Sequence, residues 1–318
     1  MLRILVLVIS AFAIALPSAS AQQFPGKPIR FIVPYPPGGG TDLVARFLGQ
    51  KMTEAWGQQV IIENRTGADG TIGVALAGRA RPDGYTIVLG VTAALCINPF
   101  LYSNVGFDAV KDFAPVTLAT QQPYFIVVHP SVPARSIKEL IALAKASPDK
   151  LTYGTSGGLN QLGLELFKAM TGIIMTNVPY AGAAPALFNL IGGQLDLVIS
   201  TPPGPLPYIR SGRLRLLAVT SSERLNIVPN IPTVAEAIPG YEVTGWYGVL
   251  APAGTPKEIV AKLNAEMVRA LRSPEIMERL SRDAVKPVGS TPEEFAVYLG
   301  KEIAKWSKVI KDSGIKPL

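Results

Sequence analysis

The chain has 318 residues and a hydrophobic content of 48%, which is enough for two domains of ordinary size and excludes an intrinsically disordered protein. Its formal net charge is +7, but the longest basic cluster, residues 210–215, carries only three charges and no aromatic side chain. Nucleic acid is therefore not an expected partner, and the mild basicity favours small anions.

The first 21 residues have the layout of a secretory signal peptide. A basic start with Arg3 is followed by the apolar run 4–16 and by the small residues of Ala19-Ser20-Ala21. The run of about 13 residues is shorter than the roughly 20 that a membrane span needs, which disfavours the alternative of a short membrane anchor. We therefore expect cleavage after Ala21 and export to the periplasm.

One cysteine, Cys96, and one histidine, His129, are present. A single cysteine excludes an internal disulfide and a cysteine-based zinc site. His129 follows an apolar, strand-like run, so we expect a structural histidine at a strand end instead of a member of a catalytic triad. The sequence thus predicts no catalytic residues, no metal and no cofactor.

The first part of the mature chain alternates strands and helices. The expected elements are strands at 29–33, 60–62 and 85–89 and helices at 41–56 and 72–79. Such alternation indicates a parallel sheet with helices on both faces.

A second domain is expected between two extended crossings at 116–121 and 241–251. Alternation restarts there, with strands at 124–128, 151–153, 177–180, 196–199 and 215–220 and helices at 136–147, 160–171 and 186–191. We place domain 1 at 22–121 and 245–318 and domain 2 at 122–244. The expected architecture is two α/β domains joined by two crossover strands, with a ligand cleft between them.

Three helix starts carry the S/T-x-x-E pattern of a capping box, beginning at Ser136, Thr255 and Thr291. In the second and third, a proline takes the first helical position. The last helix has Phe295, Leu299, Ile303, Trp306 and Ile310 at spacings of three to four residues. This stripe predicts that the helix packs on a domain.

The stretch 35–42 follows a strand and opens a helix, and it contains two prolines and three glycines. Glycines there leave backbone N–H groups uncovered at the positive end of a helix, which favours an anion. A dinucleotide loop needs a third glycine in register and a P-loop needs a lysine, and this stretch has neither. A carboxylate needs only N–H groups and hydroxyls.

Two further glycine-bearing loops, at 155–158 and 181–185, follow strands of the second domain. Because ligands sit at the carboxyl ends of strands in such sheets, all three loops are expected at one cleft. The alternative is that each is an ordinary turn, that Asp42 only stabilises a helix dipole and that Asp196 is a turn residue. The predicted ligand-binding residues are Tyr35, Gly38, Gly39, Gly40, Thr41, Asp42, Thr92, Thr155, Ser156, Gly157, Tyr180, Gly182, Ala183 and Asp196.

Residues 24–42 and a series of later motifs resemble the Bug family, the TctC-like periplasmic solute-binding proteins of tripartite tricarboxylate transporters. The later motifs are Glu63-Asn64-Arg65 with Gly67-Ala68, Pro82-Asp83-Gly84-Tyr85-Thr86, Ile97-Asn98-Pro99 with Leu101-Tyr102, Asp108 with Asp112-Phe113, Val178-Pro179-Tyr180 with Gly182 and Pro185-Ala186, Gly192-Gly193-Gln194-Leu195-Asp196, and Pro232-Thr233 with Glu236. The resemblance implies a type II periplasmic-binding, Venus-flytrap fold. It also implies a carboxylate ligand held by backbone amides and bridging waters, and delivery to a membrane permease.

Two departures from the family pattern lie in the second domain. Ala181 stands where the family commonly has lysine, and Gln161 stands where a histidine is usual. We therefore expect a mono- or dicarboxylate with a less charged or aromatic far end. The alternatives are a sensor that closes onto a kinase's outer domain and, less favoured, an enzyme on the same fold; we expect a monomer.

Overall fold

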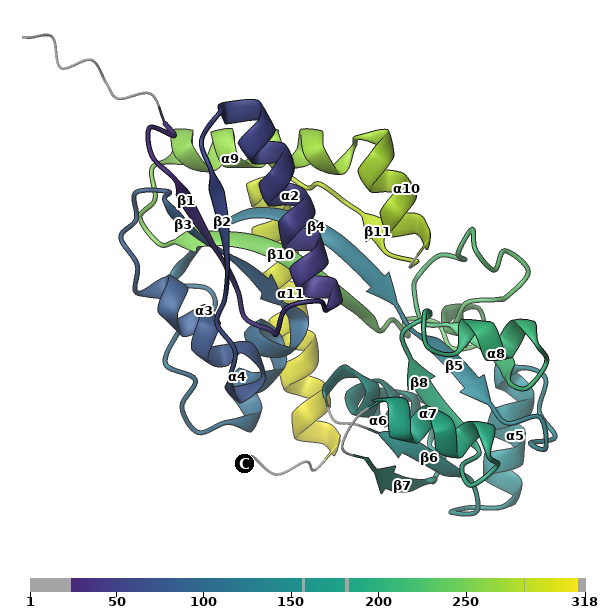
Figure 1. Cartoon of the computed structure of the whole chain (residues 1–318). Coiled ribbons are helices and arrows are strands. Elements are labelled where there is room, and N and C mark those ends of the chain that lie inside the picture. Colours follow the sequence, from purple (N-terminus) through teal and green to yellow (C-terminus); the bar gives the residue numbers. More distant parts are fainter. Residues whose placement is uncertain (1–23, 156–157, 181–182, 283, 314–318) are drawn as a thin grey trace, which may run out of the picture.

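The chain forms two α/β lobes, each built around its own β-sheet (Figure 1). The structure, a computed structural model, describes residues 24–155, 158–180, 183–282 and 284–313. The predicted signal peptide therefore lies outside the described residues. Among the described residues, no helix combines the length and the apolar character that crossing a membrane requires.

Lobe 1 is assembled from the first and last parts of the chain. Its elements are β1 (Ile29–Val33), α2 (Gly40–Trp56), β2 (Val60–Asn64), η1 (Ala68–Gly70), α3 (Thr71–Gly78), β3 (Thr86–Val91), η2 (Ala93–Ile97), α4 (Asn98–Leu101), β4 (Phe113–Pro123), β10 (Thr244–Pro252), α9 (Lys257–Leu271), α10 (Pro274–Arg282), β11 (Lys286–Pro287) and α11 (Pro292–Ser313). Its strand order is β11-β4-β10-β3-β1-β2.

Lobe 2 comes from the middle of the chain. Its elements are β5 (Phe125–Val128), α5 (Ile137–Ala146), β6 (Thr152–Thr155), α6 (Gly158–Thr171), β7 (Thr176–Pro179), α7 (Ala183–Ile191), β8 (Leu197–Ser200), α8 (Leu206–Arg210), β9 (Arg215–Val219) and η3 (Val234–Glu236). Its strand order is β7-β6-β8-β5-β9.

The expected parallel sheets are mixed sheets. In lobe 1, β1 pairs in parallel with β2 and β3, but β10 runs antiparallel to β3 and β4. In lobe 2, β6 pairs in parallel with β7 and β8, whereas β5 is antiparallel to β8 and β9. The chain leaves lobe 1 along β4 and returns along β10, and a returning strand beside a departing one must run the opposite way.

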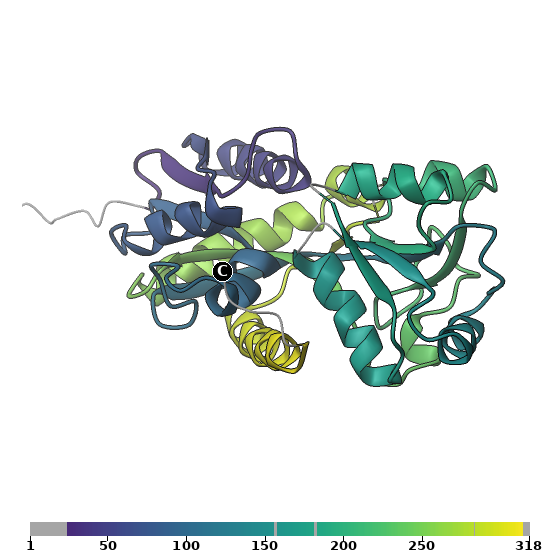
Figure 2. The ribbon, with the colours of Figure 1, turned by 90° about the horizontal axis from the view of Figure 1, so that it is seen from below.

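The crossings are these two paired strands. β4 ends at Pro123, opposite Thr244 at the start of β10. The predicted domain boundaries at 122 and 245 lie next to this pair and stay a prediction. Figure 2 shows the lobes side by side, with α11 on the part of lobe 1 near lobe 2, where it contacts α6.

The predicted capping boxes form fully in one of three cases, at Thr291 and Glu294. Ser136 caps α5 by accepting from the Glu139 N–H, but the Glu139 carboxylate accepts from the Arg135 N–H, so only half of that box forms. The box at Thr255 is wrong, because α9 begins at Lys257 and the Thr255 hydroxyl donates to the carbonyl of Pro252. The predicted apolar stripe of α11 is confirmed, since Phe295, Leu299, Trp306 and Ile310 are buried and Ile303 is half-buried.

Candidate functional site

A cavity of about 220 Å³ lies between the lobes, and both crossing strands contribute to its wall. Its lining residues are Tyr35, Thr41, Val91, Thr92, Ala93, Gln122, Tyr124, Leu159, Thr201, Gly245, Trp246 and Tyr247. None of these described lining residues carries a charge. An anion in the cavity therefore depends on N–H groups, hydroxyls and the helix dipole.

The N-terminus of α2 reaches this cavity through Thr41. Gly39 is the N-cap residue, has an extended backbone (φ −81°, ψ 170°) and makes no side-chain capping bond. The first backbone N–H groups of a helix have no acceptor within the helix. In most helices an N-cap side chain accepts from the second or third of them, so the glycine here leaves these donors open to a ligand.

Tyr247 closes the cavity over this helix start. Its hydroxyl lies near the side chains of Thr41 and Gln122, and a Cβ placed on Gly40 would lie 3.2 Å from it. Burial raises the pKa of the Tyr247 phenol above its ordinary value, so the hydroxyl stays protonated and remains a donor. A side chain at position 40 would require the Tyr247 hydroxyl to shift by a few tenths of an ångström.

Asp42 braces the glycine loop from behind. Its carboxylate accepts from the Gly38 N–H at 2.9 Å, from Arg46 Nε at 2.9 Å and from Asn64 Nδ2 at 3.0 Å. Asn64 also donates to the Tyr35 carbonyl at 2.9 Å. These bonds use the carboxylate on the protein itself, which agrees with the structural alternative for Asp42, and the residue does not line the cavity.

Asp42→Asn is expected to lower the free energy of unfolding at pH 7 by about 1–3 kcal/mol, because buried donors lose their anionic acceptor. Burial alone would raise the pKa of Asp42, but hydrogen bonds from Arg46, Gly38 and Asn64 outweigh it and hold the pKa below the ordinary value. A depressed carboxyl pKa stabilises the fold above the unfolded pKa of about 3.9, and this contribution fades as pH falls below that value.

Urea unfolding of the wild type and of Asp42→Asn at pH 7 and pH 3 measures this contribution to the free energy of unfolding. The difference between wild type and Asp42→Asn should shrink at pH 3, while Asp312→Asn, an exposed control, should change little at either pH. If wild type and Asp42→Asn differ in free energy of unfolding by the same amount at both pH values, the ionised Asp42 carboxylate does not stabilise the glycine loop.

Tyr35 presents its ring to the cavity while its hydroxyl is held elsewhere. The hydroxyl donates to Asp69 Oδ1 at 2.9 Å and lies 3.1 Å from the Asp69 carbonyl. Burial and the neighbouring Asp69 carboxylate raise the pKa of Tyr35. Asn98 in turn donates to the Asp69 carbonyl at 3.0 Å, and Asp69 has a positive φ of 48°. The segment around Asp69, after β2, is thus held in place by Tyr35 of the loop after β1.

Thr92 and Trp246 join β3 to the returning strand. The Trp246 N–H donates to Thr92 Oγ1 at 2.9 Å. The indole of Trp246 donates to Glu302 Oε2 at 3.1 Å, and the indole of Trp306 donates to the same oxygen at 3.0 Å. Lys305 forms an ion pair with the other oxygen of Glu302. A buried carboxylate on α11 therefore fixes one wall of the cavity.

The predicted residues of lobe 2 are only partly placed. Thr155 is buried at the carboxyl end of β6, and its hydroxyl donates to Asn177 Oδ1 at 2.8 Å. Tyr180 accepts from Asn189 Nδ2 at 2.8 Å, and Ala183 is exposed at the start of α7. Ser156, Gly157 and Gly182 lie outside the described residues. Contacts of these lobe-2 residues with a ligand stay a prediction.

Asp196 lies at the wrong end of the sheet for the predicted contact. It precedes β8, and its carboxylate accepts from the N–H and the hydroxyl of Thr152 at 2.7 and 2.9 Å, at the start of β6. The cleft loop follows Thr155, at the other end of that strand. His129 is nearby, since its N–H donates to the Asp196 carbonyl, and it follows β5 as expected of a strand-end histidine.

Of the predicted residues, the cavity wall contains Tyr35, Thr41 and Thr92. Gly38, Gly39 and Gly40 lie at the helix start beside it. The residues supplied by the crossings and by lobe 2 are not among those predicted; they are Gln122, Tyr124, Leu159, Thr201, Gly245, Trp246 and Tyr247. The one available signal was the aromatic content of the returning strand.

No cluster of metal-binding side chains is found in the described ranges. Cys96 is buried, and burial raises the pKa of its thiol well above the ordinary value. The thiol is therefore protonated and a poor nucleophile.

Comparison with known proteins gives one consistent family. Residues 44–315 match the family model described as "Tripartite tricarboxylate transporter family receptor". BugT of Bordetella pertussis is 35% identical over 99% of this chain and 98% of its own length. A UPF0065 protein encoded between tcbD and tcbE in a Pseudomonas species is 38% identical over 95% of this chain and 93% of its own.

Solved structures of the same kind share the two-lobe fold. A Rhodopseudomonas palustris protein solved with adipate has a TM-score of 0.77 and 38% identity, covering 93% of this chain and 100% of that one. MatC from Rhodopseudomonas palustris, solved with malate, has a TM-score of 0.73 and 32% identity, covering 90% and 100%. A TctC solute-binding protein from Polaromonas, without ligand, has a TM-score of 0.82 and 28% identity, covering 91% and 99%.

Proposed function

The chain belongs to the tripartite tricarboxylate transporter receptor family, and from that premise we propose that it captures a small carboxylate between its lobes. The bound acid is then delivered to the membrane permease of a tripartite tricarboxylate transporter. The ligand is a mono- or dicarboxylate or an aromatic acid. The receptor works in the periplasm after its first 21 residues are removed, and it releases the acid chemically unchanged.

The observation that carries this proposal is the open start of α2 at the interlobe cavity. Gly39 leaves the first N–H donors uncapped, while Thr41 and Tyr247 place hydroxyls beside them. Hydrogen bonds to a charged group contribute about 1.5–3 kcal/mol each. Three or four of them, after losses, account for micromolar affinity, which corresponds to about −8 kcal/mol.

The far end of the cavity supports a ligand with little second charge. Leu159 and Thr201 are its contributions from lobe 2, and Tyr35 and Tyr124 supply apolar surface. The described lining offers no cation for a second or third carboxylate. Ala181, where the family commonly has lysine, lies outside the described residues and points the same way by sequence. Because relatives were solved with adipate and malate, we expect a ligand of similar size.

A calorimetric and thermal-shift screen of the mature protein tests the function and the ligand class together. The panel is benzoate, adipate, malate and citrate. At 100 times its dissociation constant a ligand adds about 2.7 kcal/mol of stability, which raises the melting temperature of a chain of this size by roughly 5 °C.

We expect shifts with the mono- or dicarboxylates and none with citrate. Stabilisation by citrate alone contradicts the ligand class but keeps the receptor function. Turnover of a bound acid contradicts the receptor function itself.

A further inference from the structure

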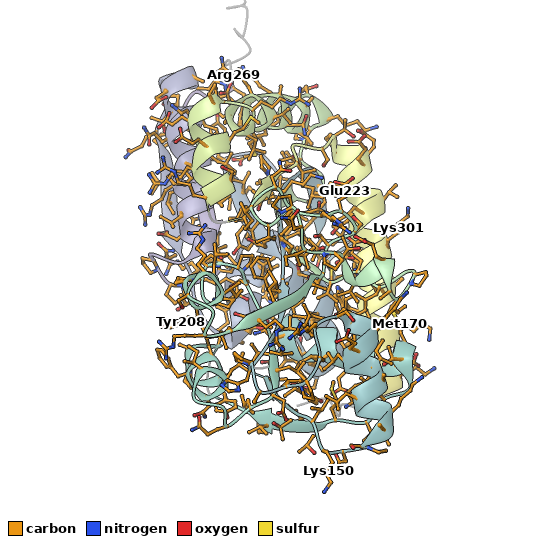
Figure 3. The ribbon with its side chains drawn as sticks, turned by 90° about the vertical axis from the view of Figure 1, so that its right-hand side faces the viewer. Lys150, Met170, Tyr208, Glu223, Arg269 and Lys301 are labelled. Carbon is orange, nitrogen blue, oxygen red and sulfur yellow. The ribbon has the colours of Figure 1, made fainter. Side chains whose placement is uncertain are left out.

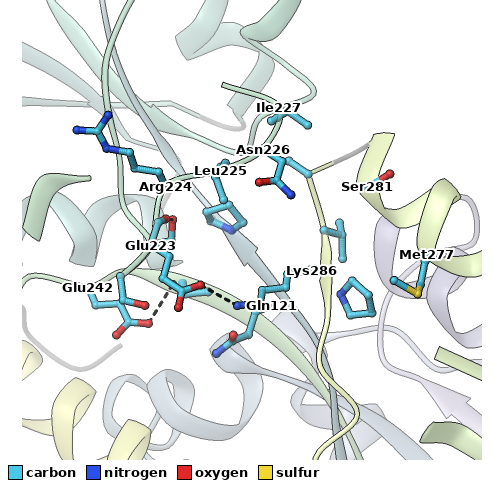
Figure 4. Close-up of a pocket in the computed structure, with 17 residues that line it drawn as sticks. Gln121, Glu223, Arg224, Leu225, Asn226, Ile227, Glu242, Met277, Ser281 and Lys286 are labelled. Atoms are coloured by element: carbon cyan, nitrogen blue, oxygen red, sulfur yellow. Dashed lines mark hydrogen bonds and ion pairs between the residues drawn. The ribbon is translucent and has the colours of Figure 1, made fainter. Parts of the chain in front are cut away.

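A second cavity, distinct from the carboxylate cleft, lies at the back of the hinge (Figure 4). Its volume is about 340 Å³, and its floor includes Gln121 and Thr244 of the two crossing strands. This size is at the lower end of the range of small-molecule sites, about 300–1,000 Å³. Neither the carboxylate function nor the sequence motifs account for it.

The walls of this hinge pocket come from both lobes. The loop after β9 supplies Glu223, Leu225 and Ile227 from lobe 2, and α10 with the segment after it supplies Met277 and Val285 from lobe 1. In the view of Figure 3, Glu223 appears at a height between Arg269 on α9 of lobe 1, at the top, and Lys150 of lobe 2, at the bottom. Because both lobes line the pocket, a molecule in it touches both lobes.

In the described part of the chain, two ion pairs lie around the hinge pocket, and one further carboxylate has no cationic partner. Glu223 pairs with Lys286 across the lobes at 3.1 Å, and Arg224 pairs with Glu236 through two bonds of 2.8 and 2.7 Å. Glu242 has no ion pair among the described residues; its Oε1 lies 3.4 Å from the Thr244 hydroxyl. One half-buried carboxylate is therefore left without a cation.

Figure 4 shows how the chemistry is distributed. Glu242 and Glu223 lie on one side of the pocket, and Met277 and Ser281 lie on the opposite side. Met277 is 48% exposed, so its apolar side chain is accessible to a molecule in the pocket. The pocket thus offers the carboxylate of Glu242, unpaired among the described residues, on one side and an apolar side chain on the other.

We propose that the hinge pocket binds a small organic monocation, with its ammonium group at Glu242 and its apolar body against Met277, Leu225 and Val285. Because the pocket is walled by both lobes, such a ligand has a different affinity for the open and closed arrangements. By linkage, the monocation then changes the affinity of the cleft for its carboxylate, and the carboxylate changes the affinity of the hinge pocket for the monocation by the same factor.

The test uses 2-phenylethylammonium as the probe and follows backbone amide shifts of the mature protein by NMR. We expect saturable shifts that map to residues 221–227, 242–244 and 277–287. Two matched probes separate the contributions. The neutral 2-phenylethanol lacks the charge, and methylammonium lacks the apolar body, so each should bind at least roughly tenfold more weakly.

Two variants locate the site. Glu242→Gln keeps the shape and the Thr244 contact and should weaken the probe roughly tenfold, and Met277→Ala should weaken it through the apolar end. Glu258→Gln, the same charge change at an exposed position of α9, should have no effect. The inference is overturned if binding of the probe does not saturate or if the shifts map to the carboxylate cleft. It is also overturned if Glu242→Gln binds the probe as tightly as wild type does and wild type binds 2-phenylethanol as tightly as the probe. None of these readouts depends on the identity of the cleft ligand.

Discussion

Glu302→Leu is expected to lower the free energy of unfolding by about 2–5 kcal/mol. Glu302 is 4% exposed, and one of its oxygens accepts from the indoles of both Trp246 and Trp306. Leucine is close in size but accepts no hydrogen bond, so two buried N–H groups lose their partner. Each such loss costs about 1–3 kcal/mol, and the Lys305 ion pair is lost as well.

The measurement is urea unfolding followed by tryptophan fluorescence, supported by a melting curve. A loss of 2–5 kcal/mol lowers the melting temperature of a chain of this size by roughly 4–10 °C. Glu302→Gln retains an oxygen for the indoles and should recover most of the stability. Glu293→Leu, at an exposed position on the first turn of the same helix, is the matched control.

The same substitution also tests the cavity wall. Trp246 lines the cavity and its backbone N–H is tied to Thr92, so a freed indole should weaken carboxylate binding in Glu302→Leu and not in Glu302→Gln. If Glu302→Leu is as stable as wild type, the two indole bonds do not stabilise the fold as the geometry indicates.

Local chemistry explains what the sequence predicts well. The strand, glycine loop and helix at 29–56 are consecutive in the chain, so proline, glycine and apolar spacing specify them without reference to the rest of the molecule. The same holds for the capping box at Thr291 and the apolar stripe of α11. The anion-ready start of α2 follows directly from these features.

Residues that depend on pairing between distant strands are harder to predict. Tyr247 and Trp246 enter the cavity because β10 inserts between β3 and β4, an order that no local pattern encodes. Asp196 illustrates the converse. Its motif lies near the other family motifs in sequence, but the short strand β8 that follows it starts at the far end of the sheet from the cleft.

Replacing Gly39 by valine is expected to weaken carboxylate binding by at least about 100-fold, or roughly 2.7 kcal/mol. Position 39 accepts a side chain without strain, because its backbone is extended and an added Cβ has no neighbour closer than the Pro36 carbonyl at 3.9 Å. Gly38 is unsuitable for this test, since its φ of +86° disfavours any other residue. A loss of binding at position 39 therefore reports on the site and not on the fold.

The reason for the loss is the direction of an N-cap side chain. Such a side chain lies over the N–H groups of the second and third helical residues, which are Thr41 and Asp42 in α2. Valine covers these donors with an apolar group. Gly39→Asp goes one step further, because its carboxylate accepts from the same donors and takes the place of the ligand.

Calorimetry with the best acid of the screen measures both variants, and melting curves verify that they fold. Gly39→Asp should melt at or slightly above the wild-type temperature, since aspartate is a better N-cap than glycine, while binding no acid. Gly300→Val, at an exposed glycine of α11 whose added Cβ meets nothing within 4 Å, is the control and should bind like wild type. Unchanged affinity in Gly39→Val, with wild-type stability, would place the carboxylate grip away from the start of α2.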